Sequence, residues 1–142
     1  YSQLFLDLNL KYKGFSLVLE YADAFASGLD QIYTDPNAFN LLIPKQISEY
    51  LIIGDSQGIQ FGYFTKNGIS VDFIYESLNP EFDLFENSIL RKTSNMGVGI
   101  SKYLAGNNLK IQASAFRTSY ENFNGLDDNQ FLSAAFLVQV AF

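Results

Sequence analysis

The sequence of 142 residues contains no cysteine, no histidine and no tryptophan. Without cysteine it can form neither a disulfide nor a thiolate site. Without histidine it lacks the most common general base and the most common transition-metal ligand in proteins. The Ser/His/Asp relay of hydrolases also loses its central member. We therefore expect no catalytic residues, no enzymatic activity and no cofactor or metal.

Basic residues are scarce as well. Lys and Arg number 9 against 15 Asp and Glu, which gives a formal net charge of -6. Proteins that bind nucleic acid neutralise its phosphates with clustered basic side chains. The charge balance therefore predicts no nucleic-acid partner.

Long apolar runs are missing too, although 48% of the residues are hydrophobic and 16% are aromatic. A membrane-spanning helix needs about 20 consecutive, mostly apolar residues. No segment of the sequence approaches that length. If this chain contacts lipid, it does so as β-structure.

The hydrophobic residues instead alternate with polar ones. Between Gln3 and Lys13, every second residue is Leu or Tyr, and Gln3, Asp7, Asn9 and Lys11 fall between them. A period of two over about ten residues is typical of a tilted transmembrane strand. The same alternation recurs along the chain and predicts seven strands, at residues 3–13, 15–22, 48–64, 69–76, 90–104, 109–121 and 130–142. The glycines between residues 54 and 58 predict a bend or bulge in the third strand.

The predicted connections alternate between short and long. Lys13-Gly14, Asn67-Gly68 and Gly106-Asn107-Asn108 are tight-turn signals, whereas the connections around Asp35, Pro80 and Asp127 are longer. Outer-membrane barrels have short periplasmic turns and longer extracellular loops. The sequence therefore predicts an all-β, antiparallel transmembrane β-barrel with the short turns and Phe142 on one rim.

Three stretches carry a resemblance to a known family. They are residues 60–68 (QFGYFTKNG) followed by 75–80 (YESLNP), residues 97–104 continued by 108–112, and the alternating apolar ending at residues 136–142. Over about residues 48–142 the sequence resembles the phosphate-selective porin O and P family of bacterial outer-membrane porins. The resemblance implies a barrel of about sixteen strands, the size of porins, that passes small solutes or ions by passive diffusion. Residues 1–142 would form the C-terminal portion, about seven strands, of that single barrel domain.

The resemblance also implies a location and partners. The protein would lie in the cell outer membrane, in contact with lipid, and would be completed by N-terminal strands that precede this sequence. It would form a homotrimer or a larger outer-membrane complex. The barrel-assembly machinery would recognise a C-terminal assembly signal that consists of Phe136, Val138, Val140 and Phe142.

Strand parity selects the residues expected to line the barrel lumen. They are Asp7, Lys11, Glu20, Asp72, Glu76, Lys110 and Gln112. Anion-selective members of the family are expected to line the pore with Arg and Lys, but here acids outnumber bases, so phosphate selectivity does not carry over. Two interpretations of the acids stay open: a lining that favours cations, and charges that merely solvate a polar interior.

Other patterns in the sequence allow further interpretations. A group of aromatic residues near the short turns predicts an interfacial girdle, although a soluble sandwich or barrel that binds a ligand would also bury aromatic residues. These residues are Tyr12, Phe15, Tyr63, Phe64, Tyr103 and Phe142. A barrel with a scaffold or accessory role in an outer-membrane complex is the alternative function. An outer-membrane enzyme, such as a lipase, would need catalytic residues from outside this sequence.

Two further groups of residues have the chemistry of a metal site or of a nucleophile. The loop acids match no calcium-loop spacing, so solvated charge is the simpler interpretation. They are Glu81, Asp83, Glu86, Asp127 and Asp128. Ser56 beside Asp55 is a possible nucleophile, but a bulge explains this glycine-flanked segment better.

Overall fold

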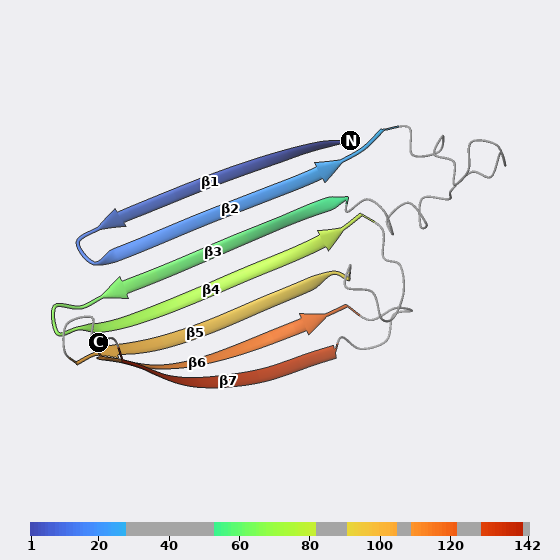
Figure 1. Cartoon of the computed structure of the whole chain (residues 1–142). Helices are drawn as coiled ribbons and strands as arrows, with labels where there is room; N and C mark the ends of the chain where they lie inside the picture. Colours follow the sequence, from blue (N-terminus) through green and yellow to red (C-terminus); the bar gives the residue numbers. More distant parts are fainter. Residues whose placement is uncertain (28–52, 82–90, 105–108, 122–128, 141–142) are drawn as a thin grey trace.

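The computed structural model of the chain describes residues 1–27, 53–81, 91–104, 109–121 and 129–140. These residues form one antiparallel sheet of seven strands, in which chain neighbours are also sheet neighbours (Figure 1). The strands are β1 (Ser2–Tyr12), β2 (Phe15–Phe25), β3 (Gly54–Phe64), β4 (Ile69–Pro80), β5 (Thr93–Tyr103), β6 (Leu109–Tyr120) and β7 (Asn129–Val140). The predicted all-β antiparallel architecture with seven strands is confirmed. No helix within the described ranges is long and apolar enough to cross a membrane.

The strand pairing is regular from one edge of the sheet to the other. In β1 and β2, Ser2 pairs with Phe25 and Tyr12 with Phe15, and the other five pairings are equally continuous. The bulge predicted at residues 54–58 is therefore wrong, because Gly54 to Tyr63 pair without interruption with both neighbouring strands. Gly54 has a φ of 133° and begins β3, so the backbone irregularity lies at the strand end. The part of the predicted strand before residue 53 lies outside the described residues.

The first hairpin turn has the backbone expected of a two-residue β-turn. Lys13 and Gly14 both have positive φ, 46° and 90°, as a type I′ turn requires. The backbone N–H of Phe64 donates a hydrogen bond of 2.7 Å to the carbonyl of Gly14. A β-carbon at Gly14 would collide with the carbonyl oxygen of Phe64, so glycine allows the turn to lie against β3. The turn at Lys13-Gly14 thus packs the first hairpin against β3.

The two rims of the sheet differ in their connections. The strand ends that flank residues 13–14, 65–68 and 104–108 lie on one rim, and those that flank residues 26–53, 81–92 and 121–128 lie on the other. The described strand ends therefore follow the predicted alternation, and Val140 ends β7 on the short-turn rim. Gly106, Asp35, Asp127 and Phe142 themselves lie outside the described residues.

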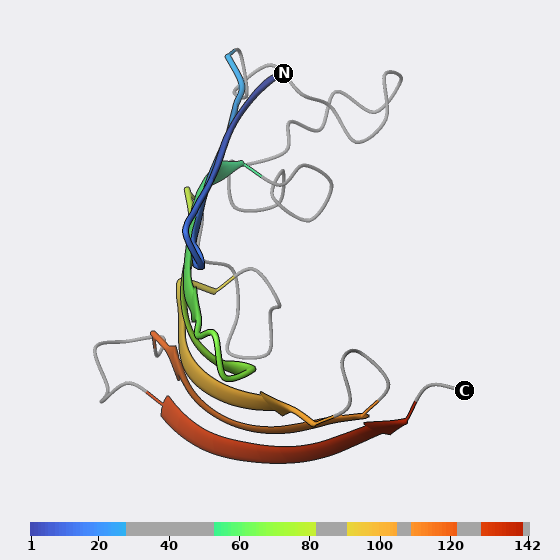
Figure 2. The same ribbon diagram turned by 90° about the vertical axis from the view of Figure 1, so that its left-hand side faces the viewer.

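The sheet is open in the described structure. β1 and β7 are its two edge strands, and contacts occur only between strands adjacent in the sheet. Viewed from the end, the sheet bends into an arc from β1 to β7 (Figure 2). Every residue of β1 and of β7 is exposed. Both edges therefore present unpaired backbone groups.

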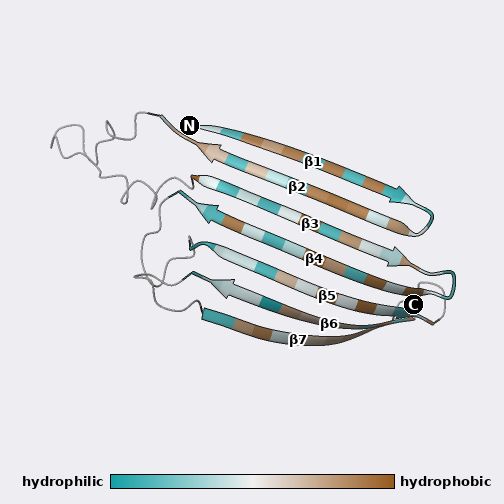
Figure 3. Ribbon diagram, turned by 180° about the vertical axis from the view of Figure 1, so that it is seen from behind, coloured by the Kyte–Doolittle hydropathy of each residue, from teal (hydrophilic) through white to brown (hydrophobic). Residues whose placement is uncertain are grey.

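The sheet has no conventional hydrophobic core. Ile53 is the only buried hydrophobic side chain among the described residues, and large hydrophobic side chains are exposed on every strand except β6. Apolar and polar residues alternate along the strands (Figure 3). Because side chains alternate between faces, the sheet presents one largely polar face and one largely apolar face.

Candidate functional site

The residues predicted to line a lumen share one face of the sheet, which we call the polar face. The register places Asp7 opposite Glu20, and continues from Glu20 through Gly58 to Glu76. A second row joins Lys11, Ser16, Gly62 and Asp72. Lys110 and Gln112 lie on the same face of β6, nearer the short-turn rim. All seven residues are therefore on one side, and three of the four acids fall in one row.

A hydrogen-bonded chain extends the row of acids across the next two strands. The Asn95 side-chain amide donates a hydrogen bond of 3.1 Å to Oε2 of Glu76. The Thr118 hydroxyl donates a hydrogen bond of 3.1 Å to Oδ1 of Asn95. Asn95 and Thr118 continue the register row of Glu76, on β5 and β6. The Asn95 amide that donates to Glu76 is neutral. These hydrogen bonds therefore orient the Glu76 carboxylate without neutralising its charge.

Gly58 leaves an opening in the middle of this row. The side chain of Glu20 reaches over it, and Oε2 of Glu20 lies 3.3 Å from the position that a β-carbon at Gly58 would occupy. A cleft of about 640 Å³ lies over this region and is lined by Asp7, Glu20, Gly58 and Glu76. The adjacent row contributes Phe5, Leu78 and Tyr120 to its wall. The cleft therefore combines carboxylates with apolar side chains.

Asp72 lies beside a glycine, Gly62, in the second row, as Glu20 lies beside Gly58 in the first. The hydroxyl of Ser70 donates a hydrogen bond of 2.7 Å to Oδ2 of Asp72. A β-carbon at Gly62 would come within 2.7 Å of Oδ1 of Asp72 and within 2.6 Å of the Ser16 hydroxyl oxygen. Both polar side chains thus lean over a glycine. Side chains converge in this way on the concave side of a bent sheet, which places the polar face inside the arc of Figure 2.

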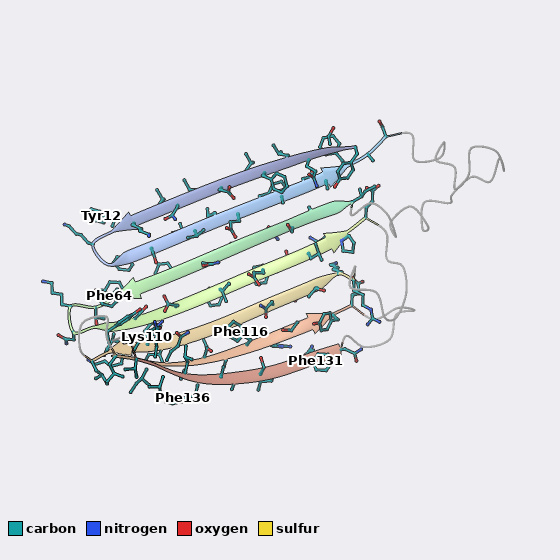
Figure 4. All side chains as sticks on the ribbon, in the orientation of Figure 1. Tyr12, Phe64, Lys110, Phe116, Phe131 and Phe136 are labelled. Atoms are coloured by element: carbon teal, nitrogen blue, oxygen red, sulfur yellow. The ribbon has the colours of Figure 1, made fainter. Side chains whose placement is uncertain are left out.

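The polar face also has an apolar hollow, near its centre. Phe116 lies over Gly97, and Ile74 and Val18 continue the row toward β2 (Figure 4). A cleft of about 240 Å³ is lined by these side chains together with polar groups such as Gln112. On β7 the same face presents Phe131 and Leu137, which are both exposed. This face is therefore not polar throughout.

The opposite face, which we call the apolar face, is hydrophobic over most of each strand. It contains Leu6, Leu8, Leu17, Leu19, Val71, Phe73, Val98, Ile111, Phe136 and Val138. Near the long-connection rim the face becomes polar, and the Asn79 amide donates a hydrogen bond of 2.9 Å to Oδ2 of Asp55. Of the four residues of the predicted assembly signal, Phe136, Val138 and Val140 lie on the apolar face of β7, and Phe142 lies outside the described residues.

The predicted aromatic group is divided between the two faces. Tyr12, Phe15 and Tyr63 are register partners on the apolar face, and the Phe15 and Tyr63 ring centroids are 4.4 Å apart. Phe64 and Tyr103 instead lie on the polar face, with ring centroids 5.5 Å apart. A single girdle that includes these two residues is therefore wrong, because parity places them on the other side.

The other candidate sites find no geometric support. Ser56 and Asp55 are consecutive residues of a regular strand, so their side chains point to opposite faces and cannot form a relay. Within the described ranges no group of three or more acidic side chains is arranged to hold a metal ion. Of the five loop acids, all but Glu81 lie outside those ranges.

Sequence analysis did not find Gly58, Asn95 or Thr118 as members of the site. Asn95 follows Glu76 by 19 residues, and the connection between β4 and β5 obscures their register. Gly58 appeared to be a strand break because glycine weakens strands. The position of Gly58 between Glu20 and Glu76 in the sheet could have indicated its role, since a glycine between two acids leaves room for their side chains.

Comparison of the chain with protein-family models gave no match, and comparisons with curated proteins and with solved structures gave none either.

Proposed function

We propose that this chain is part of an outer-membrane porin-like channel that passes small solutes or ions by passive diffusion. The observation that carries this proposal is the pair of contrasting faces. One face exposes leucine, valine and phenylalanine on strands of 11 or 12 residues, and the other carries the charged side chains. An apolar face of this extent is unusual in a soluble monomer.

Strand length and connection pattern support the same proposal. Strands of 11 or 12 residues are slightly longer than the roughly 9 to 11 residues that cross a bilayer when tilted. Short turns gather on one rim and longer connections on the other, as in outer-membrane barrels. The bend of the sheet and its two unpaired edges fit a segment of a larger closed barrel.

The resemblance to the porin O and P family gives the barrel its proposed class, location and partners. Further strands of the same protein close the barrel, lipid covers the apolar face, and the assembly machinery binds the β7 ending. Members of the porin family are often trimeric, so the proposed assembly is a homotrimer or a larger outer-membrane complex. We propose no catalytic role and no cofactor.

A second candidate, a barrel with a scaffold or accessory role, is favoured by one observation. Phe131 and Leu137 are 60% and 53% exposed on the polar face of β7. A water-filled lumen gains nothing from such side chains, whereas a covered or plugged interior would bury them.

Conductance of the complete protein in planar bilayers tests the proposal. Discrete steps whose current is proportional to voltage are expected for an open channel. Membrane insertion without conductance would favour the scaffold role. Purification without detergent would contradict both, because the apolar face would then be compatible with water.

A further inference from the structure

We propose that Asp7, Glu20 and Glu76 make the channel prefer cations to anions, with Gly58 as a positioning residue. The proposal rests on the channel function above and adds the class of permeant ion. Rings of carboxylates in a pore attract cations through their local field. No bound ion is required, because the effect depends on the potential along the path.

The arrangement of the three acids concentrates their charge. They occupy one register row on β1, β2 and β4, and β3 contributes only Gly58 between them. Adjacent strands are about 4.8 Å apart, so the three carboxylates fall within about three strand spacings. The Glu20 side chain leans over Gly58, toward the strand that carries Glu76. The row therefore presents a band of negative charge along the wall of the 640 Å³ cleft.

The charge of this row is not neutralised by its surroundings. Among the described residues, none of the three carboxylates forms an ion pair, and the partner of Glu76 is the neutral Asn95 amide. Lys11 shares the face but lies four residues from Asp7, about 13 Å along the strand. That distance exceeds the Debye length of about 8 Å at physiological salt. Lys110 lies close to the short-turn rim, 5.5 Å from the centre of the Tyr103 ring.

Zero-current potentials in a KCl gradient measure this preference. The full native chain is inserted into planar bilayers, and the permeability ratio of K⁺ to Cl⁻ is compared between wild type, Asp7→Asn, Glu20→Gln, Glu76→Gln and the triple variant. We expect wild type to prefer K⁺, and each neutralisation to lower the ratio by about twofold, as for a unit charge that lies about two strand spacings away in water and is partly screened by salt. The preference should weaken toward about 1 M salt, where the Debye length is about 3 Å.

Asp23→Asn is the matched control. Asp23 lies three residues from Glu20 on the same strand but on the apolar face, near the long-connection rim. Asp23→Asn removes one negative charge from the face of the sheet opposite the three acids. The permeability ratio of this variant should therefore equal that of wild type. The conductance step of every variant at high salt reports whether the barrel has assembled.

Gly58 gives a second test by addition of charge. Gly58→Lys places a cation in the middle of the row and should reverse the preference toward Cl⁻, whereas Gly58→Gln, of similar size, should retain a preference for K⁺. A conducting wild type whose ratio is the same in the triple variant would overturn this inference alone. A ratio lowered equally by Asp23→Asn would also overturn it. A wild type that inserts without conducting would contradict the channel function itself.

Discussion

The ring of Phe116 covers Gly97 on the neighbouring strand so closely that a β-carbon at Gly97 would collide with it. The same β-carbon would also come within 2.8 Å of a methyl carbon of Ile74. Three strands, β4 to β6, therefore meet at a position where only glycine fits. A phenylalanine ring over a glycine compensates for the side chain that the strand lacks.

Gly97→Ala should destabilise the folded protein by about 1 to 3 kcal/mol, the usual cost of overpacking. Gly99→Ala is the control, because a β-carbon there would approach its neighbours no closer than 3.9 Å, at ordinary contact distance. Denaturant unfolding in lipid or detergent measures the difference. Equal stability of the two variants would contradict the close contact between Phe116 and Gly97.

Leu8→Arg should impair membrane insertion, because Leu8 lies on the apolar face of β1. An arginine at the bilayer midplane costs about 2 to 4 kcal/mol. Asn9 is the next residue along β1 and lies on the polar face. Asn9→Arg should therefore leave membrane insertion intact and alter only the ion preference. The amount of folded protein recovered from outer membranes compares them, and equal losses would contradict the proposed orientation of the sheet.

Single cysteines can locate the two rims, because the chain has no cysteine of its own. Glu81→Cys lies on the long-connection rim and Asn67→Cys on the short-turn rim, and both positions are exposed. A maleimide attached to a polymer too large to pass through a porin, added to intact cells, should label Glu81→Cys and leave Asn67→Cys unmodified. The reverse result would invert the proposed orientation in the membrane.

Phe15→Ala should destabilise the protein more than Phe25→Ala does. Both residues lie on the apolar face of β2 and are about half exposed, but Phe15 also contacts the rings of Phe61 and Tyr63. Aromatic pairs contribute about 0.5 to 1.5 kcal/mol beyond the burial of area. Thermal unfolding of the two variants in the same detergent should show this difference, and its absence would mean that the rings do not interact.

The sequence predicts the strands well because their signal is local. Leu6, Leu8, Leu10 and Tyr12 alternate with polar residues, and parity within a strand fixes which side chains share a face. The site required more than parity. Pairing Glu76 with Asn95 depends on the register across a long connection, which the sequence does not determine.

Two errors have specific physical causes. Gly54 and Gly58 both indicated an interruption of β3, but Gly58 is paired on both sides and interrupts nothing. Phe64 and Tyr103 lie near turns, as girdle residues do, but their parity assigns them to the polar face. In both cases the position of the residue in the alternation, and not its type, determines its structural role.

The strictly sequential order of the strands has a consequence for folding and for truncation. Each strand contacts only the strands next to it in the chain, so every pairing closes a hairpin and none requires a crossover. Hairpins can therefore be added one after another, each using the free edge left by the previous one as a template. Removal of β1 and β2 would create a new edge at β3 and leave the register of the remaining five strands unchanged. In this respect the sheet is modular, with the hairpin as its unit.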